Sequence, residues 1–309
     1  MMTQMNTTSK TQFRIDPRTR PGHVHLTVAQ LDRQLDFYQN VIGLQLHWRR
    51  GASAGLGVGR EDMLRLTEVS GARRSRGTTG MYHFAILLPN RRELARAIAR
   101  LYSLGVPNYP TDHIMTKTTY LDDPEGNNIE LYTESPEDGT MSFVNGEAET
   151  RRADGSASDG REALDVEALF RQLLPDDSLD QGMPAETRIG HFHLYVADLD
   201  RSMHFYHDVL GFDEMGIARS FRMGMVSAGR YHHHIGFNTW VGEGAPPPAP
   251  GSLGMRYITF LLPNKSDLEQ ISERLRTEGI PTEQTEEGLK VEDPSQNSII
   301  LTDASSKAG

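Results

Sequence analysis

The sequence predicts an α+β protein in which four strand-helix-strand-strand-strand modules form two tandem domains with curved mixed sheets. The chain has 309 residues, which is long enough for two domains. Four segments of its first half recur in the same order in its second half, at offsets of 168 to 174 residues. The recurring pairs are GHVHLTV at 22–28 with GHFHLYV at 190–196, FYQNVIGL at 37–44 with FYHDVLGF at 205–212, LLPN at 87–90 with 261–264, and DDPEGNNIEL at 122–131 with EDPSQNSIIL at 292–301. Four ordered matches indicate an internal duplication.

Each half divides again into two similar modules. In the first module, alternating side chains over 23–28 predict a strand, and apolar residues at helical spacing over 31–42 predict a helix. Gly43 ends that helix, and strands follow as far as 63–66.

The second module repeats this order. A strand over 82–88 precedes a helix over 94–104, and strands follow near 119–121 and 128–132, where an Asp-Pro-Glu-Gly turn joins them. The four modules are expected at 21–70, 81–134, 189–240 and 255–303.

The module positions predict the domain organisation of the chain. Residues 1–20 form a polar N-terminal tail, 21–136 the first domain, 137–186 a linker, and 187–304 the second domain. The linker is rich in Gly, Ser, Asp and Glu, and apolar residues at helical spacing predict one amphipathic helix over 162–174.

Composition excludes several classes of function. Hydrophobic content of 37% and charged content of 24% are typical of globular proteins. A net charge of -10 indicates no nucleic-acid partner. The sequence has no cysteine, which excludes disulfides and thiolate catalysis and suits a reducing cytoplasm. No apolar leader and no run near the roughly 20 apolar residues of a membrane span are present, so we expect a cytoplasmic protein without membrane contact.

Two strands of the second module each carry a metal-capable side chain within an apolar run. His83 lies in MYHFAILL and Glu130 in NIELY. Buried carboxylates are rare unless they are paired or bind a metal. The matching positions of the other half are Tyr257 and Ile300, so the fourth module cannot supply the same pair. The sequence therefore predicts a single metal site that includes His83 and Glu130.

The repeated segments resemble those of the vicinal oxygen chelate superfamily, which includes glyoxalases, bleomycin-resistance proteins and extradiol dioxygenases. The resemblance is carried by HVHLTVAQLDRQLDFYQNVIGL, HFHLYVADLDRSMHFYHDVLGF, DPEGNNIELY and DPSQNSIILT, and it covers residues 21–136 and 187–304. The segments YHFAILLP, YHHHIGFNTW and APPP resemble most closely bacterial two-domain catechol 2,3-dioxygenases of the CatE type. This resemblance implies paired modules whose concave sheet holds a divalent metal, and it makes a homo-oligomer possible.

The resemblance leaves two histidines open as the third metal ligand. Family members take a metal-ligand histidine from the first strand of each paired module, at a fixed position before a V-x-D-L segment. His191 in the third module and His23 in the first occupy this position. His193 follows two residues after His191, on the same strand face, and is a substrate-binding candidate. The last strand of the third module also carries three consecutive histidines, at 232–234. We therefore expect it to pair with the second module and to complete the set His83, Glu130 and His191.

The resemblance also implies roles for further residues. Within the histidine run, His233 matches the family's acid/base histidine, and His232 is the second candidate, for substrate binding. Because neighbouring strand residues face opposite sides, not all of 232–234 are expected to line one site. Tyr120 matches a tyrosine near the substrate oxygen, and His113 matches a substrate-contacting histidine in the preceding loop.

The function implied is an extradiol ring-cleaving dioxygenase that opens a catechol-type aromatic diol with O2. Two histidines and one carboxylate on one face are the donor set of non-haem Fe(II) oxygenases, and Mn(II) suits the same ligands. The implied reaction belongs to aromatic-hydrocarbon catabolism. Two alternatives stay open: a glyoxalase-like metal-dependent lyase or isomerase, and a metal-free small-molecule-binding protein of the same superfamily.

Overall fold

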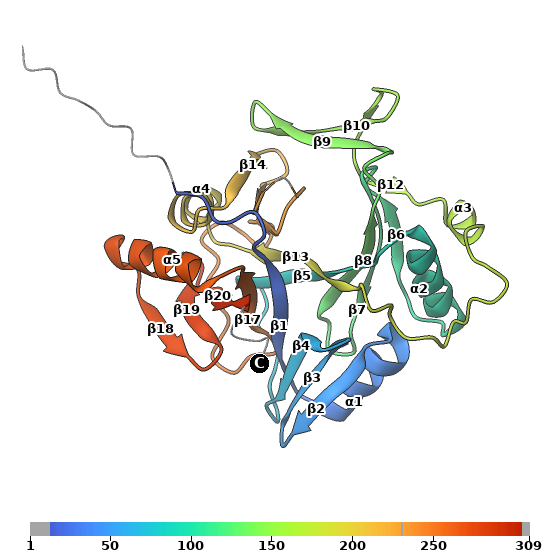
Figure 1. The fold of residues 1–309 in the computed structure, drawn as a ribbon, viewed down its shortest axis with the longest axis horizontal. Coiled ribbons are helices and arrows are strands. Elements are labelled where there is room, and N and C mark those ends of the chain that lie inside the picture. The colour runs from blue at the N-terminus through green and yellow to red at the C-terminus, as the bar shows by residue number, and fades with distance from the viewer. Residues whose placement is uncertain (1–12, 230, 305–309) are drawn as a thin grey trace, which may run out of the picture.

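Two large mixed sheets make up the fold, and a computed structural model describes residues 13–229 and 231–304 of it (Figure 1). All four expected strand-helix-strand-strand-strand modules are present. The first comprises β1 (Arg20–Val28), α1 (Leu31–Asp36), η1 (Phe37–Ile42), β2 (Gln45–Arg50), β3 (Ser53–Val58) and β4 (Glu61–Glu68), and the second β5 (Gly80–Leu87), α2 (Arg91–Ser103), β6 (Tyr109–Asp112), β7 (Thr116–Asp122) and β8 (Asn128–Glu134). The third comprises β13 (Arg188–Tyr195), α4 (Leu199–Met203), η2 (His204–Val209), β14 (Asp213–Ala218), β15 (Met223–Ser227) and β16 (Ile235–Asn238), and the fourth β17 (Gly254–Leu262), α5 (Lys265–Thr277), β18 (Thr282–Thr285), β19 (Gly288–Glu292) and β20 (Ser298–Asp303).

Each sheet combines one module from each half of the repeat. The nine-stranded sheet has the order β12-β6-β7-β8-β5-β13-β16-β15-β14, so it joins the second module to the third. The eight-stranded sheet has the order β18-β19-β20-β17-β1-β4-β3-β2 and joins the fourth module to the first. Antiparallel pairing of β5 with β13, and of β1 with β17, forms the two junctions. The expected pairing of the second and third modules is therefore confirmed.

Side chains of β13 alternate between the hydrophobic core on one face of the sheet and the candidate site on the other. Phe192 and Leu194 are fully buried in the main hydrophobic core, where the Phe192 ring lies 5.8 Å from Phe260 of the other sheet. Because successive strand residues point to opposite faces, His191 and His193 project from the other side of the sheet. They line a cavity there.

The repeated motifs contact each other and stabilise the fold. The Tyr38 hydroxyl, in the first FY motif, donates a hydrogen bond of 2.9 Å to Asp123 of the Asp-Pro-Glu-Gly turn. Tyr206, in the second FY motif, donates one of 2.8 Å to Asp293 of the matching turn. All four side chains are buried. These matches in the sequence thus reflect packing of the modules and take no part in the metal site.

Removal of one of these hydroxyls tests that structural role. We expect Tyr206→Phe to lower the free energy of unfolding by about 1–2 kcal/mol, because the buried Asp293 carboxylate loses a donor. Chemical denaturation followed by circular dichroism measures the change. Tyr102→Phe is the matched control, since Tyr102 is 49% exposed. An equal effect of both substitutions would contradict the assignment.

The helix expected over 31–42 has two conformations. An α-helical part, α1, ends at Asp36, and η1 continues as a π-helical turn over Phe37–Ile42. The backbone N–H of Gly43 bonds to the carbonyl of Tyr38, five residues earlier, which is the π-helical pattern. The third module repeats the change between α4 and η2. Apolar spacing alone does not distinguish these two helical types.

The linker is more structured than predicted. Strands β9 (Gly139–Val144), β10 (Glu147–Arg152) and β11 (Ala157–Ser158) form a small sheet that projects beside β14 (Figure 1). The predicted helix within 162–174 is wrong in extent, because β12 (Glu162–Ala163) pairs with β6 and α3 covers only Val166–Phe170. Asp165 caps α3 by accepting from the N–H of Ala168 and so fixes its start.

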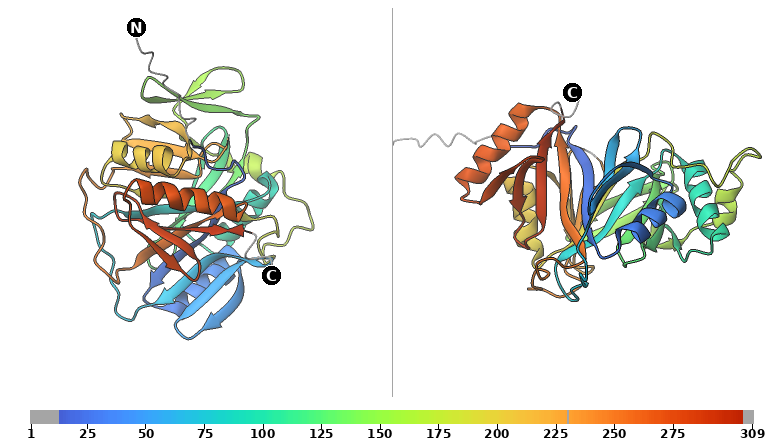
Figure 2. Two further views of the ribbon diagram at one scale, coloured as in Figure 1. Left: turned by 60° about the vertical axis from the view of Figure 1, so that its left-hand side comes forward. Right: turned by 90° about the horizontal axis from the view of Figure 1, so that it is seen from below.

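Part of the predicted N-terminal tail contacts the third module. Ile15 is buried, and its N–H donates to the carbonyl of Gly211 at 2.8 Å. The remainder of that prediction, residues 1–12, lies outside the described residues. Figure 2 shows the helices on the outer sides of the sheets. No helix among the described residues is long and apolar enough to cross a membrane.

Candidate metal centre and substrate cavity

The three predicted metal ligands come from three adjacent strands of the nine-stranded sheet. His83 lies on β5, Glu130 on β8 and His191 on β13, with β5 between the other two. Each is 3% exposed. Their strand neighbours, such as Phe84, Ile129 and Phe192, point into the core, so alternation brings all three polar side chains to one face.

The distances among the ligand atoms fit three donors to a single metal ion. Nε2 of His83 lies 3.1 Å from Oε2 of Glu130, Nε2 of His191 lies 3.0 Å from the same oxygen, and the two nitrogens are 3.3 Å apart. With metal–ligand bonds of about 2.1 Å, adjacent vertices of an octahedron are about 3.0 Å apart and those of a tetrahedron about 3.4 Å apart. Two of the separations lie near the octahedral value and the third, between the two nitrogens, lies nearer the tetrahedral one, so the triangle suits three donors on one side of a single metal ion.

The ionisation of these residues also suits a metal. Burial alone would raise the pKa of Glu130, but hydrogen bonds and attraction from His191 and His83 hold the pKa well below its usual range. Burial lowers the pKa of His191 to about 4, and the negative charge of Glu130 only partly offsets this. An anionic carboxylate beside a neutral imidazole is the protonation state that metal coordination requires.

Buried neutral histidines make the stability of the metal-free protein depend on pH. Burial lowers the pKa of His25 to about 3, of His191 to about 4 and of His234 to about 3. In the unfolded chain they take up protons near the ordinary pKa of about 6.5, whereas the folded chain resists. The contribution of these histidines to the free energy of unfolding is therefore fully present above about pH 6.5. It is lost as the pH falls toward their pKa values in the folded protein.

We expect the free energy of unfolding to fall by up to about 1.4 kcal/mol per pH unit for each such histidine below about pH 6.5. Urea titrations of the metal-free protein between about pH 7.5 and pH 5 measure this slope. Constant or rising stability across that interval would contradict the buried neutral state.

His23, the alternative third ligand, lies in the other sheet. Its Nε2 is 3.2 Å from Oε2 of Glu287, and Arg65 forms an ion pair of 2.8 Å with the same carboxylate oxygen. Tyr257, which matches His83 in the repeat, also donates to Glu287. This face of the eight-stranded sheet thus contains an ion-pair network, and the structure does not bring His23 to His83 and Glu130.

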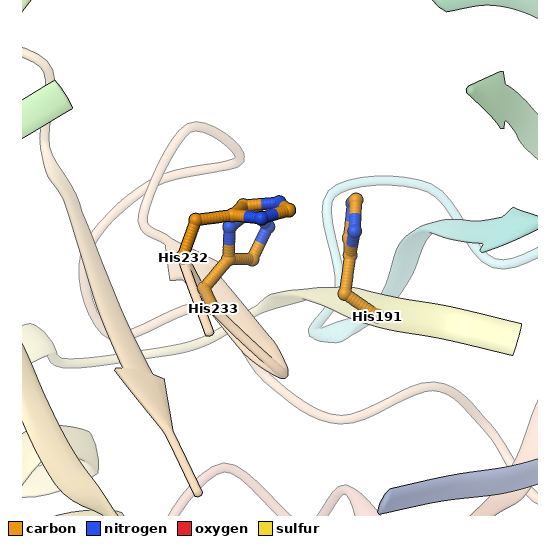
Figure 3. Close-up of side chains that lie close together, drawn as sticks. All are labelled: His191, His232 and His233. Carbon is orange, nitrogen blue, oxygen red and sulfur yellow. The ribbon is translucent and has the colours of Figure 1, made fainter. Parts of the chain in front are cut away.

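The histidine run lies in the turn before β16, not within a strand. His232 and His233 both line the cavity, and the ring of His233 lies 4.1 Å from that of His191 (Figure 3). His234 turns away, and its Nδ1 accepts from the N–H of Ala228 at 3.0 Å. The expected alternation of faces fails between His232 and His233, because the segment is not extended in a ladder there.

His233 and His232 differ in their surroundings. Burial lowers the pKa of His233 well below its ordinary value, and the neighbouring His191 and His232 act in the same direction. Its Nδ1 has no hydrogen-bond partner among the described residues. His232 instead places Nδ1 3.4 Å from a carboxylate oxygen of Glu134. His191, His232 and His233 form a second group of potential metal ligands beside the triad.

Tyr120 and His113 form a hydrogen-bonded pair at the cavity wall. Tyr120 lies opposite Glu130 in the pairing of β7 with β8, and its hydroxyl is 3.0 Å from Nε2 of His113. Nδ1 of His113 donates to the carbonyl of Gly160 in the linker at 2.5 Å. Burial and the adjacent Glu130 charge raise the pKa of Tyr120 well above its usual range, so its hydroxyl stays a hydrogen-bond donor.

His193 lies beside the triad on an aromatic wall that the sequence did not predict. Its Nε2 accepts from the side-chain amide of Asn238 at 3.0 Å. Its ring lies 5.1 Å from His83, 5.2 Å from Tyr82 and 5.7 Å from Trp240. Trp240 closes the segment YHHHIGFNTW, so its position near the histidine run was the available signal.

Tyr132, a second residue that the sequence analysis did not assign to the site, packs against His191. Tyr132 follows Glu130 by two residues on the same strand face, a spacing that could have revealed it, and its ring lies 5.0 Å from His191. A Cβ atom at position 190 would lie 1.8 Å from the Tyr132 hydroxyl. Gly190 therefore permits Tyr132 to pack beneath the ligand histidine.

All of the predicted site residues except His23 line one cavity of about 590 Å³. The triad lies against one wall, the His232–His233 pair and Tyr120 lie beside it, and linker residues 158–163 contribute a further side. This volume lies within the range of small-molecule sites. The arrangement can hold one metal ion and present a ring-sized ligand to it.

Comparison with known proteins identifies the family. The family model described as the glyoxalase/bleomycin resistance protein/dioxygenase superfamily matches residues 20–131 and 188–301. A catechol-2,3-dioxygenase of Bacillus subtilis (strain 168) is 38% identical over 285 residues, which cover 91% of this chain and 96% of that protein.

Solved structures share the fold. A Bacillus subtilis protein that is provisionally called a dioxygenase has a TM-score of 0.64 at 14% identity, over 94% of this chain and 86% of that one. Glyoxalase I from Zea mays has a TM-score of 0.54 at 18% identity, over 92% of each chain. At these identities the structural likeness concerns the fold. The chain belongs to the glyoxalase/bleomycin resistance protein/dioxygenase superfamily.

Proposed function

We propose that this chain is an extradiol dioxygenase that cleaves a catechol-type aromatic diol with O2 at a mononuclear Fe(II) site. The observation that carries the proposal is the facial set of His83, Glu130 and His191, with the His233 ring packed against His191 in the same cavity. The name of the Bacillus subtilis relative, which is 38% identical over most of both chains, supports the same activity.

Two histidines and one carboxylate are the donors that suit Fe(II) in oxygen-dependent enzymes, and Mn(II) can occupy the same set. When bound, Fe(II) supplies the redox centre at which the diol and O2 react. His83, Glu130 and His191 would hold the metal from one side, and its other side would face the cavity, where both substrates could bind. Sheet strands position all three donors, so the site needs little rearrangement on metal binding.

His233 and Tyr120 perform the proton chemistry of the proposed reaction. Because burial keeps His233 neutral, its imidazole can accept the proton of a diol hydroxyl and later return it during ring opening. Tyr120 retains its proton, and its hydroxyl can turn from Nε2 of His113 to donate a hydrogen bond to a diol oxygen. His193, His232 and His113 complete the polar side of the cavity and orient the ring.

Anaerobic loading of the metal-free protein with Fe(II), followed by catechol and air, tests the proposal. We expect uptake of O2 and a yellow ring-opened hydroxymuconic semialdehyde. A glyoxalase-like activity would instead turn over a hemithioacetal without O2 uptake. Failure to consume O2 with catechol, alkylcatechols, acidic catechols and hydroquinones, although Fe(II) is bound, would contradict the proposal.

A further inference from the structure

The linker between the two halves forms one wall of the candidate active site. Residues 158–163 line the cavity, and three contacts hold this segment in place. Strand β12 pairs with β6 at the sheet edge, Glu162 forms an ion pair with Arg152, and the carbonyl of Gly160 accepts from His113. The segment is therefore a fixed part of the cavity wall.

Arg161 is the one cationic side chain that this segment brings to the cavity. Its guanidinium carbon lies 5.6 Å from the centre of the Trp240 ring, a distance typical of a cation–π contact. Among the described residues its guanidinium has no carboxylate partner. The two acidic neighbours are engaged elsewhere: Asp159 accepts from the backbone N–H of Arg161, and Glu162 pairs with Arg152.

An aromatic wall connects Arg161 to the triad. The Trp240 ring lies 5.7 Å from His193 and 5.1 Å from Tyr82, and both of these rings flank His83. A flat ring between the triad and Trp240 would therefore project its substituents toward the guanidinium.

We propose that Arg161 is a specificity-determining residue that binds a carboxylate substituent of the diol, so that the preferred substrates are catechols with an acidic side group. This inference rests on the proposed function. A guanidinium matches a planar carboxylate with two parallel hydrogen bonds. Its contact with Trp240 restricts the side chain before the ligand arrives, which reduces the entropy lost on binding.

Steady-state kinetics of the Fe(II)-loaded protein test the assignment. We compare kcat/KM for protocatechuate, which carries a ring carboxylate, with kcat/KM for methylcatechol, which is neutral. Arg161→Ala should lower the ratio of the two values by about tenfold or more, chiefly through KM for the acid, and Arg161→Lys should recover part of it. Arg171→Ala removes the same charge from an exposed linker position outside the cavity and should leave the ratio unchanged. An unchanged ratio in Arg161→Ala overturns the proposal.

A binding measurement separates this inference from the proposed function. The protein has two tryptophans, Trp48 and Trp240, so a Trp48→Phe background reports on Trp240 alone. Benzoate should quench that fluorescence at lower concentration than benzyl alcohol does, and Arg161→Ala should remove the difference. Arg161-dependent quenching without cleavage of any diol would support the anion site and overturn the dioxygenase. Equal quenching by benzoate in the parent and Arg161→Ala proteins would overturn the anion site, whether or not the protein cleaves a diol.

Discussion

Glu130→Gln should lower the affinity for Fe(II) by at least about 100-fold and abolish ring cleavage. The substitution keeps the shape of the side chain but removes the only anionic donor of the triad. Loss of a group that only supports a metal ligand already lowers metal affinity about 10- to 100-fold. Loss of a direct ligand should therefore lower it further. Competition with a fluorescent chelator measures the affinity, and metal analysis after desalting measures the content.

The metal-free Glu130→Gln protein supplies a second readout. Without metal, Glu130 is a buried carboxylate that contacts the imidazoles of His83 and His191. Because burial of a charge is costly, its neutral isostere should not lower the melting temperature of the metal-free protein. We expect metal to stabilise the parent protein and to have little effect on the variant. Equal stabilisation of both by Fe(II) would contradict the role of Glu130.

His233→Gln should lower kcat by about 100- to 10,000-fold, the usual contribution of a general acid/base. Fe(II) content should stay at the level of the parent protein, because His233 lies beside the triad and is not one of its corners. The variant cannot exchange a proton with the diol, whereas binding of the ring depends on other walls of the cavity. KM should therefore change much less than kcat.

His232→Gln is the matched comparison, because His232 is the adjacent histidine in the same cavity. Its Nδ1 lies 3.4 Å from a carboxylate oxygen of Glu134, and its ring lies 5.8 Å from His191, against 4.1 Å for the ring of His233. We expect a smaller loss of kcat than for His233→Gln. A larger loss in His232→Gln, with His233→Gln near parent activity, would reverse the two roles.

The sequence predicts the modules, and His83 with Glu130, from short-range periodicity and the comparison of repeats, whereas His191 as the third ligand follows from the resemblance to the superfamily. His83, Glu130 and His191 each lie within an apolar strand, and period-two alternation places each on the face opposite to the core residues. Comparison of the two halves of the repeat adds the number of metal sites, which the pattern of a single strand does not indicate. Tyr257 and Ile300 show that the matching sheet lacks the same donors, and in the structure that sheet holds the ion-pair network of Glu287.

Other features depend on long-range contacts that periodicity does not encode. The start of the predicted linker helix is displaced because Glu162 and Ala163 pair with a strand edge about fifty residues earlier in the chain. Arg161 reaches the cavity only because this pairing positions its segment. His232 and His233 lie on the same side because the turn before β16 interrupts the extended backbone. Each of these misses concerns a segment whose conformation a distant partner determines.

The second and third modules are proposed to share one metal site. The two histidines His191 and His23 occupy matching positions of the repeat, so alanine substitutions at these positions form a controlled pair. The most direct measurement is the metal content of the His191→Ala and His23→Ala proteins after anaerobic loading with Fe(II) and desalting. We predict that His191→Ala loses the metal and that His23→Ala keeps one ion per chain. Retention of metal by His191→Ala together with its loss from His23→Ala would contradict the account.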